Sequence, residues 1–179
     1  MLIRRANDND IPFLNKLLYQ VAAVHHAIRP DLFRASAKKY TDAQLKEILL
    51  DDETPVFLAE DGGEKLGYAF CLFQRHRNDG ALNDFDALYI DDLCVDEAAR
   101  GKHVGTALFD FVRRFAQENG CRCVTLNVWT GNDSARAFYD KMGMKPQKTT
   151  LEFQLGVRSE EFAVALPAAK QNKRFFKVS

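Results

Sequence analysis

Apolar residues near the start of the chain recur with a helical period. Residues 1–5 predict a short strand, and the polar residues 7–10 supply N-capping side chains for a helix that begins near Pro12. The apolar positions that follow are spaced as one side of a helix requires. They are Ile11, Leu14, Leu17, Leu18, Val21 and Val24. We therefore expect this helix to cover one face of a sheet.

The next segments predict a second helix and then a β-hairpin. The helix spans residues 43–50, with Thr41 or Asp42 as its N-cap. Extended patterns then continue to residue 76 on either side of a turn at residues 61–63. This turn contains Asp and two Gly residues, which tolerate the positive φ angles of tight turns. The polar residues 77–83 are expected to form a loop.

The second half of the chain changes from strand to helix twice. The stretch 88–108 has the pattern of a buried strand, a short glycine-containing loop and an amphipathic helix. A strand over 121–128, a helix capped by residues 132–134 and ended by Gly143, and a strand over 148–155 complete the pattern. Strands outnumber the interspersed helices, which predicts an α/β fold with a mixed, mostly antiparallel sheet flanked by helices.

Composition and charge exclude several functional classes. The 179 residues suit one domain, and 46% hydrophobic content is enough for a core. Lys plus Arg and Asp plus Glu number 25 each, so the net charge indicates neither a nucleic-acid nor a membrane partner. No apolar run approaches the roughly 20 residues that span a bilayer, and the N-terminus has no signal core. These features predict a cytoplasmic protein.

Neither the cysteines nor the histidines form a metal-binding pattern. Cys71, Cys94, Cys121 and Cys123 lie in strand-like segments without CxxC spacing, so we expect reduced, structural thiols. The adjacent residues at 25 and 26 are both His, and neighbours on a helix point in different directions. We therefore predict no metal site. The same helix end and the following loop form either a simple helix terminus or one wall of a substrate pocket.

The last part of the chain predicts an extension, residues 156–179. Its first half has the pattern of one more strand, and its second half carries Lys170, Lys173, Arg174 and Lys177 without an acid. A solvated tail, an anion-binding segment and a homodimer contact remain alternatives for it.

The glycine-containing loop within residues 88–108, which opens into the amphipathic helix, has the features of an anion-binding site. Backbone N–H groups at a helix N-terminus lack intrahelical partners, and the helix dipole favours negative charge there. Arg100 and Lys102 add positive charge, while Gly101 and Gly105 allow close approach of the backbone.

Two motifs together resemble the GNAT superfamily of acetyl-CoA-dependent N-acetyltransferases. The loop RGKHVGTAL resembles that family's phosphate loop, Arg/Gln-x-x-Gly-x-Gly/Ala, with His103 at the middle glycine position. About thirty residues later, GNDSARAFYDKMGM resembles the family's Asn…Ala…Phe-Tyr…Gly-Phe block, with Met144 in place of the aromatic residue. The resemblance covers roughly residues 1–155, which implies a single GNAT-fold domain followed by the extension.

The resemblance implies a cofactor site for acetyl-CoA, used as a cosubstrate. The backbone of Leu93, Cys94 and Val95 is expected to pair with the pantetheine arm like an added strand. The loop and first turn are expected to hold the pyrophosphate through Arg100, Gly101, Lys102, His103, Val104, Gly105 and Thr106. The later helix is expected to contribute further contacts from Asn132, Ala135, Phe138 and Tyr139.

Two residues are expected to be catalytic. By resemblance, Tyr139 donates a proton to the departing thiolate, and Asp91 activates the amine as it does in some polyamine-acetylating relatives. Asp91 and Asp92 are adjacent, so on a regular strand only one of them faces the acceptor. A role of Asp92 or of a relaying water remains open. A covalent acetyl-cysteine at Cys94 is less favoured, because no partner that would activate its thiolate is evident.

The expected reaction is direct acetyl transfer to the primary amine of a small cationic acceptor, such as a polyamine or an amino acid. Asp84 and Asp86, near Asp91 in sequence, make this region acidic and favour a cationic amine. Two alternatives remain. One is acetylation of a protein N-terminus or lysine, as in the ribosomal-protein-acetylating relatives, and the other is a non-catalytic, acetyl-CoA-binding regulatory module.

Overall fold

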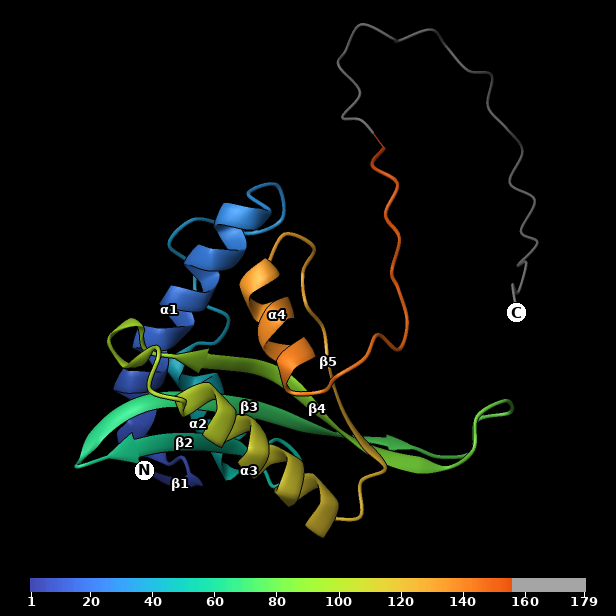
Figure 1. The fold of residues 1–179 in the computed structure, drawn as a ribbon, viewed down its shortest axis with the longest axis horizontal. Helices are drawn as coiled ribbons and strands as arrows, with labels where there is room; N and C mark the ends of the chain where they lie inside the picture. The colour runs from blue at the N-terminus through green and yellow to red at the C-terminus, as the bar shows by residue number, and fades with distance from the viewer. Residues whose placement is uncertain (156–179) are drawn as a thin grey trace, which may run out of the picture. The chain divides into compact units, whose positions relative to one another are not determined.

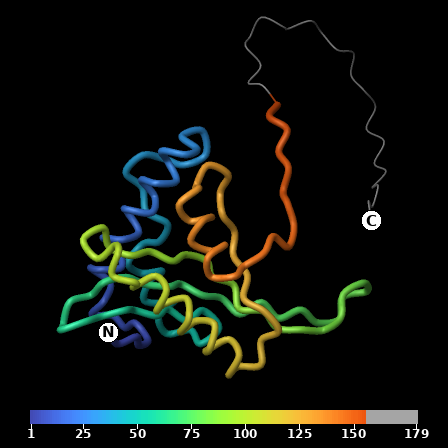
Figure 2. Tube along the Cα trace, in the orientation of Figure 1, coloured from blue at the N-terminus to red at the C-terminus, as the bar shows by residue number. Residues whose placement is uncertain are grey.

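The computed structural model describes residues 1–155, of which Met1–Lys145 form one compact unit and a second unit begins at Pro146 (Figures 1 and 2). The strands are β1 (Leu2–Arg5), β2 (Val56–Asp61), β3 (Glu64–His76), β4 (Phe85–Val95) and β5 (Cys123–Leu126). The helices are α1 (Ile11–Ile28), α2 (Asp42–Leu50), α3 (Val104–Glu118) and α4 (Asp133–Lys141).

The strands form one mixed sheet in the order β1-β2-β3-β4-β5. Neighbouring strands are antiparallel except β4 and β5, which are parallel. The predicted hairpin is confirmed as β2 and β3, joined by Gly62 and Gly63 at φ of 56° and 86°. The α/β class and the mixed, mostly antiparallel sheet are confirmed as well.

Each face of the sheet is covered by a different pair of helices. Along β2 and β3, alternate residues contribute to two separate cores, as the two-residue period of a strand requires. The core on the α3 side includes Phe57, Ala69, Leu88, Ile90, Leu108 and Val112, with Phe138 and Tyr139 of α4 packed against it. The core on the α1 and α2 side includes Leu14, Leu17, Leu45, Leu58, Tyr68 and Cys94.

A β-bulge interrupts β4 at Asp91. Ile90 pairs with Cys71 and Asp92 pairs with Phe70, so Asp91 has no opposing residue on β3. The extra residue reverses the alternation: Ile90 belongs to the core on the α3 side, whereas Cys94, also even-numbered, belongs to the core on the α1 side. The bulge therefore changes which side chains of β4 face α1.

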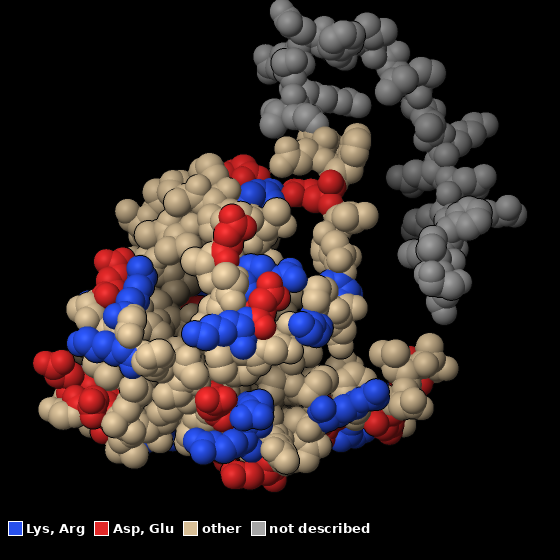
Figure 3. All heavy atoms as spheres, in the orientation of Figure 1, with Lys and Arg blue, Asp and Glu red and all other residues tan. Residues whose placement is uncertain are grey.

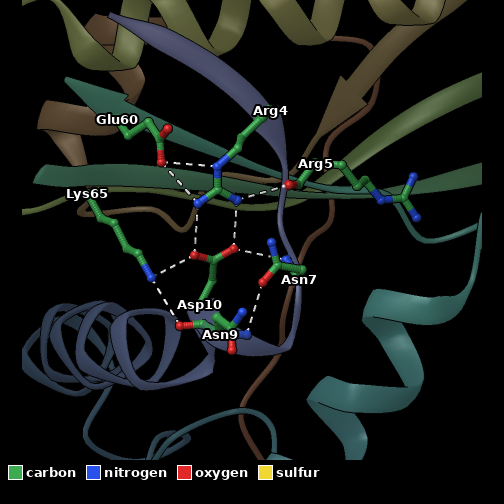
Figure 4. A network of polar contacts seen from close by, with 7 residues as sticks. All are labelled: Arg4, Arg5, Asn7, Asn9, Asp10, Glu60 and Lys65. Atoms are coloured by element: carbon green, nitrogen blue, oxygen red, sulfur yellow. Dashed lines mark hydrogen bonds and ion pairs between the residues drawn. The ribbon is translucent and has the colours of Figure 1, made fainter. Parts of the chain in front are cut away.

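Asp10 anchors the start of α1 to the sheet. Its side chain is 1% exposed and accepts two hydrogen bonds from the Arg4 guanidinium, at 2.8 and 3.0 Å (Figure 4). Lys65 lies 2.7 Å away, and the Asn7 N–H donates to the same carboxylate at 2.9 Å. Burial alone would raise the pKa of Asp10, but the hydrogen bonds from Arg4 and Lys65 outweigh it and hold this pKa well below its ordinary value.

Replacing Asp10 with Asn is expected to lower the free energy of unfolding by about 2–4 kcal/mol, because Arg4 and Lys65 lose their shared anion. Urea denaturation at neutral pH measures this change. Asp61→Asn is the control, since Asp61 is 65% exposed in its pair with the N-terminus and should contribute less than about 1 kcal/mol. Equal losses in the two variants would contradict the role of Asp10.

The pH dependence of stability follows from the lowered pKa of Asp10. A carboxylate with a lower pKa in the folded state stabilises above its unfolded pKa of about 3.9, and this contribution disappears as the pH falls below that value. Acid unfolding of the wild type should therefore steepen below about pH 4, and Asp10→Asn should show a shallower acid limb.

Three features of the sequence prediction were wrong. Residues 148–155 form no strand: Leu151, Phe153 and Leu155 alternate, but they are 90%, 87% and 85% exposed and pair with no strand among the described residues. The strand predicted over 121–128 is shorter, because its paired residues are 123–126. Val24 on α1 is 41% exposed. The expected extension, 156–179, lies outside the described residues.

Candidate active site

A cavity of about 860 Å³ opens where β4 and β5 diverge. The walls come from α1 and the loop that follows it, from β4 and β5, and from α4. The space-filling view shows this face hollowed between α1 and α4, with charges of both signs around it (Figure 3). Most of the predicted site residues line it together: Asp91, Leu93, Cys94, Val95, Arg100, Gly105, Asn132, Ala135, Phe138 and Tyr139.

The divergence of the two strands leaves one edge of β4 open. Pairing between β4 and β5 runs from Ala87–Cys123 to Ile90–Leu126 and stops there. Residues 92–95 pair with β3 on their other side, so the open edge beyond Ile90 has no partner strand among residues 1–155. Residues 92–95 all line the cavity. An extended chain with amide groups can pair with this edge as a strand does.

The loop before α3 has the geometry of an anion site at a helix N-terminus. Gly101 and His103 adopt left-handed conformations, with φ of 79° and 59°, and α3 begins at Val104. The Val104 side chain is 1% exposed in the core, so only its backbone can serve a ligand. Of this loop and first turn, Arg100 and Gly105 line the cavity. The others, Gly101, Lys102, His103, Val104 and Thr106, are absent from its lining.

Packing does not require glycine at position 105. A Cβ there would lie 3.4 Å from the Phe138 ring and 3.6 Å from the Val95 side chain, which are ordinary van der Waals distances. At Gly101 a Cβ would meet nothing within 4 Å, and only the backbone conformation there favours glycine.

His103 occupies a conformation that favours glycine, and this strain is measurable. Replacing it with Gly is expected to raise the free energy of unfolding by about 0.5–1 kcal/mol, since non-glycine residues are disfavoured at positive φ. Gly101→Ala, the matched control, should lower stability by a similar amount because it introduces the same strain without a clash. Thermal unfolding of both variants checks this; shifts of the same sign would contradict it.

Helix α4 brings Tyr139 and Asn132 to the cavity. The Asn132 side chain caps the helix by accepting a hydrogen bond from the Ala135 N–H at 3.3 Å, so it has a structural role besides the predicted cofactor contact. Tyr139 packs against Phe138 and Phe109, at ring distances of 5.1 and 6.2 Å. Burial, and then the charge of Asp92, raises the pKa of the Tyr139 phenol, which therefore keeps its proton at neutral pH.

Asp92 is the carboxylate with the more perturbed environment. It accepts a hydrogen bond from the Tyr68 hydroxyl at 2.7 Å and lines the cavity. Burial raises the pKa of Asp92 to about 6; the Tyr68 hydrogen bond lowers it and the adjacent Asp91 charge raises it. Asp92 is thus poised to take up a proton near neutral pH.

Asp91 also lines the cavity, so the expectation that only one of the two aspartates faces the acceptor was wrong. The reason is the bulge, which removes the regular alternation on which that expectation depended. Lys39 lies 2.6 Å from both carboxylate oxygens of Asp91, and the Tyr40 hydroxyl donates to Oδ2 at 2.6 Å.

The expected acidic cluster around Asp91 does not form. Asp86 lies at the opposite end of β4, paired with Arg75 at 2.9 Å and Arg77 at 2.7 Å. Asp84 accepts a hydrogen bond from the Asn78 N–H at 3.1 Å within the neighbouring loop. Among the described residues, only Asp91 and Asp92 contribute carboxylates to the cavity wall.

The cysteine of the predicted cofactor segment is not an activated nucleophile. The Cys94 side chain points toward α1, with Sγ 3.9 Å from the Leu17 carbonyl oxygen. Burial, and then the Asp92 charge, raises the pKa of its thiol to about 12. A thiolate is therefore scarce at neutral pH, which favours direct attack by an amine over an acetyl-cysteine intermediate.

Other residues near the cavity come from segments in which the sequence showed no catalytic or cofactor-binding motif. The end of α1 and its loop line the cavity through His25, Phe33 and Arg34, which confirms that this elbow forms a pocket wall. Phe33 stacks edge-on against Trp129, at 5.2 Å between ring centroids. Lys39, Tyr40 and Trp129 were not identified from sequence, because only the folded loop brings them to β4 and β5.

Residues 21–144 match the family described as the Acetyltransferase (GNAT) family. The chain belongs to this family. It is a GNAT-family N-acetyltransferase, in agreement with the names of its curated relatives. The prediction from the two sequence motifs is confirmed.

Two relatives are bacterial and archaeal. The chain is 26% identical over 157 residues to the uncharacterized N-acetyltransferase YhfO of Bacillus subtilis (strain 168), with 88% of this chain and 98% of the relative covered. It is 27% identical over 118 residues to the uncharacterized N-acetyltransferase MJ1207 of Methanocaldococcus jannaschii, with 66% of this chain and 51% of the relative covered.

Solved structures show the same fold. A mutant of the BH1408 protein from Bacillus halodurans aligns with a TM-score of 0.83 at 28% identity, covering 87% of this chain and 99% of that one. The aminoglycoside N-acetyltransferase AAC(6')-Iy in complex with CoA aligns with a TM-score of 0.64 at 17% identity, covering 87% and 100%. The second likeness concerns the fold alone.

Neither a metal cluster nor a membrane span is found in the part of the chain that the structure describes. Residues 1–155 contain no group of three or more His, Cys, Asp or Glu arranged to hold a metal ion. No helix in this range is both long and apolar enough to cross a bilayer.

Proposed function

We propose that this GNAT acetyltransferase uses acetyl-CoA to acetylate a primary amine inside the cavity between α1 and α4. When bound, acetyl-CoA supplies an activated acetyl group as a thioester. Two observations support the fit. The edge of β4 over residues 92–95 is open for an extended, amide-containing arm. The α3 N-terminus, with Arg100 beside it, suits a pyrophosphate.

Two residues are assigned to the two proton transfers of the reaction, Tyr139 as the donor and Asp92 as the acceptor. Tyr139 stays protonated and lines the cavity, so it can donate its proton to the departing thiolate sulfur. The amine must lose a proton to form its new bond, and Asp92 is the favoured acceptor because burial raises its pKa to about 6. Asp91 stays a predicted catalytic residue, but its pairing with Lys39 and Tyr40 favours a binding role.

The observation that carries this proposal is that Tyr139 and Asp92 line the same cavity at the open edge of β4. Tyr139 as the acid and Asp92 as the base are then available beside the same reacting centre. A module that only binds acetyl-CoA needs neither of these two groups. The thiol pKa of Cys94 further favours direct transfer.

The acceptor class is the finer part of the proposal. A small amine is favoured over a protein substrate because the site is a cavity of about 860 Å³ with walls on several sides. Asp91 and Asp92 favour a cationic acceptor, such as a polyamine or a basic amino acid, although Asp84 and Asp86 do not add to this attraction.

A thiol-release assay with acetyl-CoA tests the proposal. The acceptors are diamines, amino acids, aminoglycosides and lysine-containing peptides. Each is supplied over a range of concentrations wide enough to detect saturation by a weakly bound acceptor. We expect release with at least one small amine and none above background with the peptides. Release with peptides alone would favour protein acetylation. Binding of acetyl-CoA without release for any acceptor would favour the regulatory module.

A further inference from the structure

Lys39 and Asp91 form an ion pair in the cavity wall. Both residues line the cavity, and the Lys39 ammonium nitrogen is 2.6 Å from each Asp91 carboxylate oxygen. The Tyr40 hydroxyl adds a hydrogen bond of 2.6 Å to Oδ2. An ammonium group is thus already bound in the cavity, and it belongs to the chain itself.

The Asp91 carboxylate and the Tyr40 hydroxyl that donates to it are held in place, whereas the Lys39 ammonium is not. Asp91 is fixed in the β4 bulge, with its side chain 23% exposed. Tyr40 stacks on Phe70 at 5.7 Å and directly precedes the N-cap of α2. Lys39 is 50% exposed and reaches Asp91 through an unbranched, flexible side chain from the loop between α1 and α2.

The position of the pair connects it with the reaction. Asp91 is the direct neighbour of Asp92, and Tyr139 lines the same cavity. Of the other cations at the wall, Lys38 pairs with Asp42 at 2.7 Å and Arg100 approaches Glu97 at 3.9 Å. Lys39 alone among the described cations bonds to Asp91.

We propose that the Asp91 carboxylate, held in place by the Tyr40 hydroxyl, forms the binding site for the ammonium group of the acceptor, and that Lys39 occupies this site until the acceptor displaces it. This inference rests on the proposed acetylation of an amine. The ligand class is a primary alkylammonium ion, whose three N–H donors can repeat the contacts that Lys39 makes. Lys39 then acts as an internal competitor that weakens the binding of every cationic acceptor.

Binding of 1,4-diaminobutane to the full chain, without acetyl-CoA, tests this inference by NMR titration. Lys39→Met should bind the diamine about threefold to tenfold more tightly than the wild type, because no internal ammonium has to be displaced. Lys39→Arg keeps a competing cation that can bind both Asp91 oxygens, so it should bind the diamine no more tightly than the wild type.

Lys38→Met is the matched control, since it removes the same charge from the same wall but leaves the Lys39–Asp91 pair intact. Its affinity for the diamine should lie within about twofold of the wild type. Adding Asp91→Asn to Lys39→Met should cancel the gain and weaken binding by more than about tenfold relative to Lys39→Met.

The inference is overturned if Lys39→Met and Lys38→Met change the affinity equally, or if neither the wild type nor Lys39→Met binds the diamine at millimolar concentration. These outcomes are independent of catalysis. A diamine that binds as expected but is never acetylated would contradict the proposed function and leave the ammonium site standing. If the diamine is acetylated but Lys39→Met and Lys38→Met bind it with equal affinity, the proposed function stands and the ammonium site is contradicted.

Discussion

Replacing Tyr139 with Phe is expected to lower kcat by about a hundredfold or more while leaving the KM for acetyl-CoA within about threefold. In the proposed mechanism the Tyr139 phenol, which is partly buried and keeps its proton, is the donor at the cavity, so its removal would leave the thiolate without this proton source. The Phe ring keeps the packing against Phe109 and Phe138. Steady-state kinetics at saturating acceptor measure both parameters.

Tyr89→Phe is the control for this experiment. Tyr89 also lines the cavity, but its hydroxyl accepts a hydrogen bond from the Asn127 amide at 3.1 Å and is not assigned to the reaction. Its kcat should change by less than about threefold. An unchanged kcat in Tyr139→Phe, or an equal loss in both variants, would remove Tyr139 from the mechanism.

Replacing Asp92 with Asn is expected to lower kcat/KM by about a hundredfold above pH 7 and to abolish the acid limb of its pH profile. The pKa of Asp92 is about 6, so in the wild type this carboxylate is protonated, and inactive as a base, below that pH. The wild-type kcat/KM should therefore fall about tenfold for each pH unit below 6. The measurement is kcat/KM for the acceptor between pH 5 and pH 8, over which the wild-type value should change by about tenfold.

The variant Asp91→Asn distinguishes the role of Asp91 from that of Asp92. It should keep the acid limb, moved to lower pH, because the loss of the adjacent negative charge lowers the pKa of Asp92. The KM for the acceptor should rise, in line with a binding role. An acid limb that persists in Asp92→Asn and disappears in Asp91→Asn would return the role of base to Asp91.

The elements that were predicted correctly are those with a strong local signal. The hairpin of β2 and β3 has an apolar, strand-like run on each side of the turn at Gly62 and Gly63, and α1 and α3 have apolar stripes with recognisable starts. The segment 148–155 shows the limit of this reasoning. Its alternation describes which side chains share a face, but a strand also needs a partner, and no local pattern supplies one.

The parts of the site that could be predicted are those defined by backbone motifs. The loop before α3 and the capped helix α4 appear as short consecutive patterns, so Arg100, Asn132 and Tyr139 were found from sequence. The placement of both Asp91 and Asp92 at the cavity was not predicted from sequence, because a bulge depends on the register between β4 and β3. Lys39 was missed for a similar reason: its contact with Asp91 joins residues 52 positions apart.

Product analysis with acetyl-CoA and 1,4-diaminobutane tests the central claim most directly, since it follows the acetyl group itself. We expect mass spectrometry to find N-acetylated diamine and free CoA in equal amounts, at a rate that depends on Tyr139 and Asp92, with no acetyl group left on Cys94. CoA released without an acetylated amine, or acetyl-CoA bound and unchanged in the presence of every amine tested, would contradict direct acetyl transfer in this cavity.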